Sequence, residues 1–86
     1  MEQRCILIAE DDSAIRELLA DLLREAGYGV RTSADGRAAL ESLLSYPPDL
    51  LLLDVNMPEI DGFRLLKMMA RECPGIPSII LTAHGE

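Results

Sequence analysis

Residues 50–62, LLLLDVNMPEIDG, join a run of four leucines directly to a carboxylate and then to a loop sequence with a proline and a glycine. A short, unbroken apolar run of this kind is typical of a strand that is buried on both faces of a sheet. Asp54 is therefore expected where a central strand ends. The stretch raises the question of why the most apolar part of the chain should stop at a charged residue.

Strands and helices are predicted to alternate along the whole chain. CILIA (5–9) reads as a buried strand, and the apolar positions that follow recur every three or four residues, as in an amphipathic helix. Asp12 or Ser13 can cap the start of this helix, and Gly27 can end it. The later elements are expected as a strand over 28–32, a helix over 34–45, a strand over 49–54, a helix over 63–72 and a strand over 76–83. Such alternation predicts an α/β domain with a parallel sheet and helices on its faces.

Size and charge exclude several classes of function. The 86 residues suffice for one small domain, and a net charge of −7 with Lys67 as the sole lysine leaves no basic stripe for binding nucleic acid. No segment resembles a signal peptide or approaches bilayer-spanning length, so a cytoplasmic protein without membrane association is expected. Cys5 and Cys73 lack metal-ligand spacing and are expected to be free thiols, and His84 is expected in a solvent-facing loop.

Polar residues stand at the predicted carboxyl ends of three strands. Glu10 and Asp11 follow the first strand, Asp54 ends the third, and Thr82 lies near the end of the fourth. If these strands are neighbours, the side chains converge at the sheet edge where ligands bind in parallel α/β folds. Close carboxylates need a cation, and an all-oxygen donor set favours Mg²⁺, with the backbone carbonyl of Asn56 as a further ligand.

The residues by themselves leave two readings of these acids open. An aspartate at a strand end is often only a turn former or a helix N-cap. Alternatively, Asp54 beside Mg²⁺ could act as a nucleophile toward a phosphoryl group and form an acyl phosphate. A phosphatase of the dehalogenase type would need a second acid two residues after the nucleophile, where this chain has Asn56.

Three stretches together resemble the receiver domain of bacterial two-component response regulators. They are ILIAEDD (6–12), LLLLDVNMPEIDG (50–62) and PSIILTAHGE (77–86), and the similarity covers essentially the whole chain. The resemblance implies a doubly wound, flavodoxin-like parallel sheet with strand order 2-1-3-4. It also implies a signalling domain that is not an enzyme, apart from catalysing its own phosphorylation.

The resemblance implies a role for each candidate residue. Asp54 would be the phosphoacceptor, served by a sensor histidine kinase or a phosphotransfer protein. Asp11 would bind Mg²⁺ directly, and Glu10 would act through a water molecule. The further contacts implied are the backbone carbonyl of Asn56 to the metal and the hydroxyl of Thr82 to the phosphoryl oxygens.

The chain also departs from the family pattern. A complete receiver continues into a fourth helix, a fifth strand with a lysine and an aromatic residue, and a fifth helix, whereas this sequence ends at Glu86. Lys67 falls in a predicted helix and cannot replace that lysine. We therefore expect residues 1–86 to be the N-terminal portion of a receiver domain. They are either a fragment of a longer response regulator, with an output domain in cis, or a shortened protein that needs a partner, such as a second copy in a homodimer, to complete it. The alternative is a degenerate receiver that binds a protein partner without phosphorylation.

Overall fold

The computed structural model describes residues 3–54 and 62–81, which form four strands and three helices in strict alternation. In chain order the elements are β1 (Cys5–Ala9), α1 (Ser13–Glu25), β2 (Gly29–Ser33), α2 (Gly36–Ser45), β3 (Leu50–Asp54), α3 (Gly62–Glu72) and β4 (Ser78–Leu81). The predicted elements are all present, with ends that differ by up to two residues where both are described. Over this described part, no helix is long and apolar enough to cross a bilayer.

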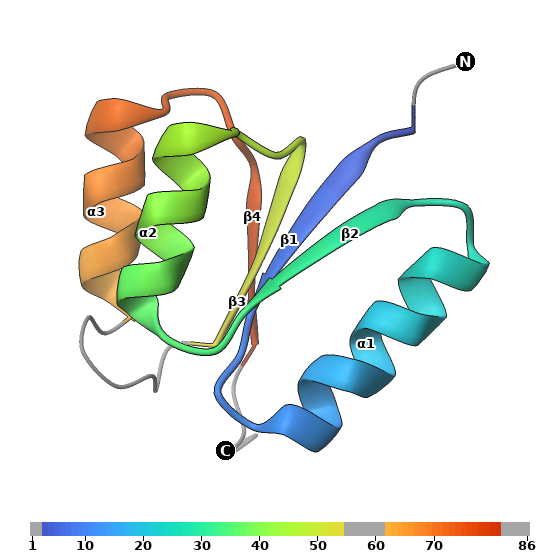
Figure 1. The fold of residues 1–86 in the computed structure, drawn as a ribbon. Helices are drawn as coiled ribbons and strands as arrows, with labels where there is room; N and C mark the ends of the chain where they lie inside the picture. Colours follow the sequence, from blue (N-terminus) through green and yellow to red (C-terminus); the bar gives the residue numbers. More distant parts are fainter. Residues whose placement is uncertain (1–2, 55–61, 82–86) are drawn as a thin grey trace.

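The four strands form one parallel sheet in the order β2-β1-β3-β4. Helix α1 covers one face, and α2 and α3 lie side by side on the other (Figure 1). This arrangement confirms the doubly wound α/β class and the predicted strand order. Strands β1 and β3 occupy the centre, so the LLLLD stretch is a central strand flanked by β1 and β4.

Alternate residues of the central strands supply two separate cores. Because successive side chains of a strand point to opposite faces, each strand contributes to both. On the α2 and α3 side the buried residues are Leu7, Ala9, Ala39, Leu43, Leu51, Leu53, Leu65 and Met69. On the α1 side they are Ile6, Ile8, Ala20 and Leu52. The leucine run of β3 is thus divided between the two layers.

Aspartates cap the first two helices. The Asp12 carboxylate accepts hydrogen bonds from the amides of Ala14 (2.9 Å) and Ile15 (3.1 Å), which decides between the two predicted caps of α1. Asp35 caps α2 through the amide of Ala38 at 2.8 Å. Beyond the end of α1, Gly27 has φ of 102°, a left-handed conformation that glycine adopts without a steric penalty.

Some apolar residues of the predicted helical faces are exposed. In α1 the exposed ones are Ile15, Leu18 and Leu22, whereas Ala20 is buried against the sheet. Leu44 of α2 and Phe63 of α3 are also exposed. Helix α1 packs on β1 and β2, and Leu18 and Leu22 lie on an exposed flank of it. The periodicity predicted the apolar face of each helix, but it did not indicate which residues of that face are covered by other elements.

Candidate functional site

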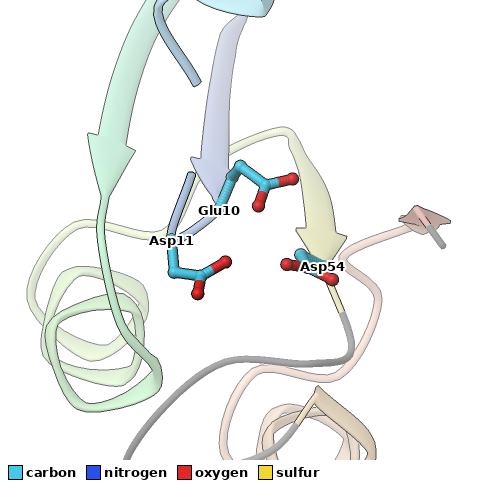
Figure 2. A group of neighbouring side chains, drawn as sticks. All are labelled: Glu10, Asp11 and Asp54. Atoms are coloured by element: carbon cyan, nitrogen blue, oxygen red, sulfur yellow. The ribbon is translucent and has the colours of Figure 1, made fainter. Parts of the chain in front are cut away.

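The carboxyl ends of β1 and β3 bring three acids together. The two strands are paired in parallel with Ala9 opposite Leu53, so Glu10, which follows β1, comes beside Asp54, the last residue of β3. Asp11 is next in the chain. Figure 2 shows the three side chains directed toward a common space at this edge. Residues separated by more than forty positions in sequence therefore form one cluster, as the strand-end pattern predicted.

The geometry of the cluster suits a metal ion. One carboxylate oxygen from each of Glu10, Asp11 and Asp54 can be chosen so that all three lie within 4.8 Å of one another. Glu10 and Asp54 are each only 5% exposed, whereas Asp11 is open to solvent. Two carboxylates are thus fixed in the protein and one faces the entry side. An all-oxygen donor set with one open side is typical of sites for hard cations such as Mg²⁺.

The environment of Glu10 shows how strongly these acids interact. The pKa of Glu10 is raised from 4.5 to about 7, mainly by burial and in addition by its hydrogen bond and charge repulsion with Asp54. The amide of Asp12, which donates to the Glu10 carboxylate at 3.2 Å, acts in the opposite direction. The site therefore holds more negative charge than it can stabilise alone, and a bound cation would relieve the repulsion.

Backbone hydrogen bonds hold the segment that carries Glu10 and Asp11. The Glu10 amide donates to the carbonyl of Ser33 at 3.0 Å, which continues the pairing of β1 with β2. From the first turn of α1, Arg16 Nη1 donates to the Glu10 carbonyl at 2.9 Å and reaches the Asp11 carbonyl at 3.5 Å. Sequence reasoning missed Arg16. A cation one helical turn after the cap is the signal that could have drawn attention to it.

The remaining predicted residues are placed as follows. Asn56 and Thr82 lie outside the described residues, although Leu81, which precedes Thr82 in sequence, pairs with Asp54 in the register of β3 and β4. Lys67 is exposed on α3. Cys5 and Cys73 are free thiols, as predicted, and His84 lies outside the described residues.

Comparison with known proteins identifies the family. The sequence model of the response regulator receiver domain matches residues 6–86. The chain belongs to the response regulator receiver family. Receiver domains are signalling domains of two-component systems, and a phosphorylated aspartate is typical of them. The doubly wound sheet and the acidic edge described above are therefore those of a receiver.

Curated relatives of this receiver are longer regulators. It is 41% identical over 86 residues to the DNA-binding transcriptional regulator NtrC of Escherichia coli K12, covering all of this chain and 18% of that protein. It is 40% identical over 79 residues to the response regulator MprA of Mycolicibacterium vanbaalenii, covering 92% of this chain and 34% of that one. The chain thus spans between about a fifth and a third of the length of these relatives.

Solved receiver structures share the fold. The response regulator TrrA of Thermotoga maritima, in complex with Mg²⁺-BeF, is 35% identical with a TM-score of 0.91, over 96% of this chain and 72% of that one. A CheY-like receiver domain protein from Methanospirillum hungatei gives a TM-score of 0.94 at 28% identity, over 99% of this chain and 68% of that one. The resemblance inferred from the three sequence stretches is thereby confirmed.

Proposed function

We propose that this receiver accepts a phosphoryl group on Asp54 in a Mg²⁺-dependent reaction, with a sensor histidine kinase or a phosphotransfer protein as donor. The observation that carries the proposal is the convergence of Glu10, Asp11 and Asp54 at the carboxyl edge of the sheet in a chain of the receiver family. The structure of TrrA from Thermotoga maritima in complex with Mg²⁺-BeF lends support by similarity.

The three acids are the proposed ligands of Mg²⁺. Asp11 and Asp54 would bind it directly, Glu10 would act through water, and the backbone carbonyl of Asn56 would complete the set. When bound, Mg²⁺ neutralises the clustered carboxylates and draws charge from the phosphoryl oxygens. The all-oxygen donor set and the raised pKa of Glu10 both support a hard divalent cation here.

The protein's own contribution is to hold the nucleophile. Asp54 ends a strand that is buried from Leu51 onward, so its carboxylate is fixed in direction and is only 5% exposed. A carboxylate oxygen held in this way can attack phosphorus in line with the leaving group, and fixed geometry of this kind lowers the entropic part of the barrier. The hydroxyl of Thr82 is the proposed contact for the phosphoryl oxygens.

The wider setting is also a proposal. The chain covers 68–72% of the solved receiver chains described above and a smaller share of NtrC and MprA, which supports the N-terminal portion of a receiver within a longer response regulator. An output domain in cis, or a homodimer partner, would then convey the phosphorylation signal. A cytoplasmic location is consistent with the family. Direct nucleic-acid binding by these residues is not expected, given the net charge of −7.

Acetyl phosphate provides a direct test. The 86-residue protein is incubated with acetyl phosphate and Mg²⁺, and intact mass spectrometry follows the formation of a single phosphoryl adduct that hydroxylamine removes, as expected of an acyl phosphate. EDTA should prevent the adduct. Asp54→Asn should abolish it, because an amide cannot form the acyl phosphate.

A matched control replaces an aspartate remote from the site. Asp21 lies on the exposed side of α1, and Asp21→Asn should be phosphorylated like the wild type. An adduct that persists in Asp54→Asn would contradict the assignment of Asp54. If wild-type protein binds Mg²⁺ but forms no adduct, the alternative of a phosphorylation-independent binding module would be favoured.

A further inference from the structure

Arg16 contacts the backbone on both sides of a proposed metal ligand. Its Nη1 donates to the carbonyl of Glu10 at 2.9 Å and lies 3.5 Å from the carbonyl of Asp11. The first carbonyl belongs to the peptide that joins Glu10 to Asp11, and the second to the peptide that joins Asp11 to Asp12. One guanidinium therefore holds the two peptide planes that flank the Asp11 Cα.

These peptide planes determine where the Asp11 carboxylate points. Each peptide unit is planar. When the two peptide units beside the Asp11 Cα are both held, the backbone dihedrals of Asp11 and the direction of its Cα–Cβ bond are fixed. Burial cannot fix the direction of the Asp11 carboxylate, because this side chain is exposed. The neighbours are anchored differently: Glu10 is buried, and Asp12 is tied down as the N-cap of α1.

We propose that Arg16 is a positioning residue that sets the Mg²⁺ affinity of the acidic site by orienting Asp11. This inference rests on the proposed function, because it assumes that the three acids bind Mg²⁺. Partners that orient metal ligands without touching the metal commonly contribute strongly to affinity. Arg16 is half-buried and is supplied by α1, so the helix that Asp12 caps also holds the loop before it.

Charge and geometry make opposite predictions for the loss of this side chain. A guanidinium beside the site repels a cation, so a purely electrostatic role predicts that Arg16→Gln binds Mg²⁺ more tightly. A positioning role predicts weaker binding, because the Asp11 carboxylate loses its fixed direction. The sign of the change therefore separates the two roles.

Isothermal titration with MgCl₂ measures this sign. We expect the dissociation constant of Arg16→Gln to rise by about tenfold, the lower end of the effects seen for groups that orient metal ligands. Arg24→Gln is the matched control, since Arg24 lies in the last turn of the same helix, where its side chain is exposed and 3.9 Å from Asp21. It removes the same charge and should leave the dissociation constant within about twofold of the wild type.

Amide hydrogen exchange of the metal-free proteins gives a second, independent readout. Arg16→Gln should speed exchange at the Asp12 amide and leave the amides of β1 unchanged, whereas a general loss of stability would speed both. If Arg16→Gln does not fold, Arg16→Met retains the aliphatic stem and is measured in its place.

The outcomes separate this inference from the proposed function. If the wild type binds Mg²⁺ and Arg16→Gln binds it as well as or better than Arg24→Gln, the role of Arg16 is overturned and the proposed function stands. If the wild type binds no Mg²⁺, the metal-dependent function fails first and this inference fails with it. The positioning role is supported if Arg16→Gln binds Mg²⁺ more weakly while Arg24→Gln does not, and if hydrogen exchange at the Asp12 amide is faster in Arg16→Gln.

Discussion

Glu10 is a buried acid whose protonation depends on its surroundings more than on its own chemistry. It is 5% exposed and lies beside Asp54, and its pKa is raised from 4.5 to about 7, mainly by burial. The proton on Glu10 is therefore held to a higher pH than on an ordinary glutamate. The same carboxyl group that would help to bind a cation stays partly neutral in its absence.

The raised pKa of Glu10 predicts a pH-dependent stability. The folded state holds this proton up to about pH 7 and the unfolded state only up to about 4.5, so the folded state binds more protons in that window. The stabilising contribution is complete below about 4.5 and is lost as the pH rises through 7. We expect the stability of the wild type to fall, relative to Glu10→Gln, across this window.

Urea unfolding in EDTA at several pH values tests this prediction. Glu10→Gln keeps a neutral side chain of similar shape and removes the titration, so the difference in unfolding free energy between the two proteins isolates this group. A difference that stays constant across the window would contradict a raised pKa. Glu17→Gln, at an exposed position of α1, controls for the loss of one carboxylate.

Among the elements, α1 links the acidic edge to the rest of the fold. Its N-cap Asp12 satisfies two amides of the first turn, and its Arg16 binds the carbonyls of the preceding loop. The start of the helix is therefore fixed relative to the carboxyl end of β1. By contrast, the flank with Leu18 and Leu22 is exposed, and the ion pair between Asp21 and Arg24 is long and open to solvent.

Removing the cap of α1 should destabilise the protein measurably. Asp12→Ala leaves the amides of Ala14 and Ile15 without their side-chain partner, which costs about 1 kcal/mol in the unfolding free energy for caps of this type. Chemical denaturation followed by circular dichroism gives this value. Asp21→Ala, on the same helix, should change stability by less than about 0.5 kcal/mol, because exposed ion pairs contribute little. Equal losses in the two variants would contradict the capping role.

For the molecule as a whole, the two faces of the sheet are covered unequally. Two helices shield the face with Leu7, Leu51 and Leu53, while α1 is the one helix that residues 3–54 and 62–81 place on the other (Figure 1). On the α1 side a cavity of about 350 Å³ opens over Leu52 and Ile79, and Ile79 is 50% exposed. The stability of this chain should therefore depend most on the layer beneath α2 and α3.

Truncation of a leucine in that layer tests this dependence. Leu65 of α3 is fully buried, and Leu65→Ala should lower the unfolding free energy by about 2–5 kcal/mol, enough to unfold a domain of this size in part. Leu22→Ala makes the same chemical change at a position that is 56% exposed, and its cost should be under about 1 kcal/mol. Thermal unfolding followed by circular dichroism compares them, and similar shifts would contradict the assignment of the core.

Much of the fold follows from local patterns. The apolar runs of β1 and β3 and the three- and four-residue spacing in α1 correctly predicted the element types, because these periods reflect the geometry of strands and helices. The convergence of the strand-end acids Glu10, Asp11 and Asp54 was also predicted from their positions, while their role in the site stays a prediction. Element ends were less accurate, since hydrogen bonding at the ends depends on neighbouring segments.

What the sequence determined by itself is therefore the order of elements, the apolar positions and the receiver pattern of acids. The tertiary structure alone decided which apolar side chains are covered, how Arg16 reaches the loop before α1, and how far the pKa of Glu10 rises. These features depend on contacts between residues that are distant in the sequence, or between a helix and the loop that precedes it. For LLLLD, local chemistry predicted a buried strand ending in a carboxylate, and the pairing of β1 with β3 placed that carboxylate beside two others.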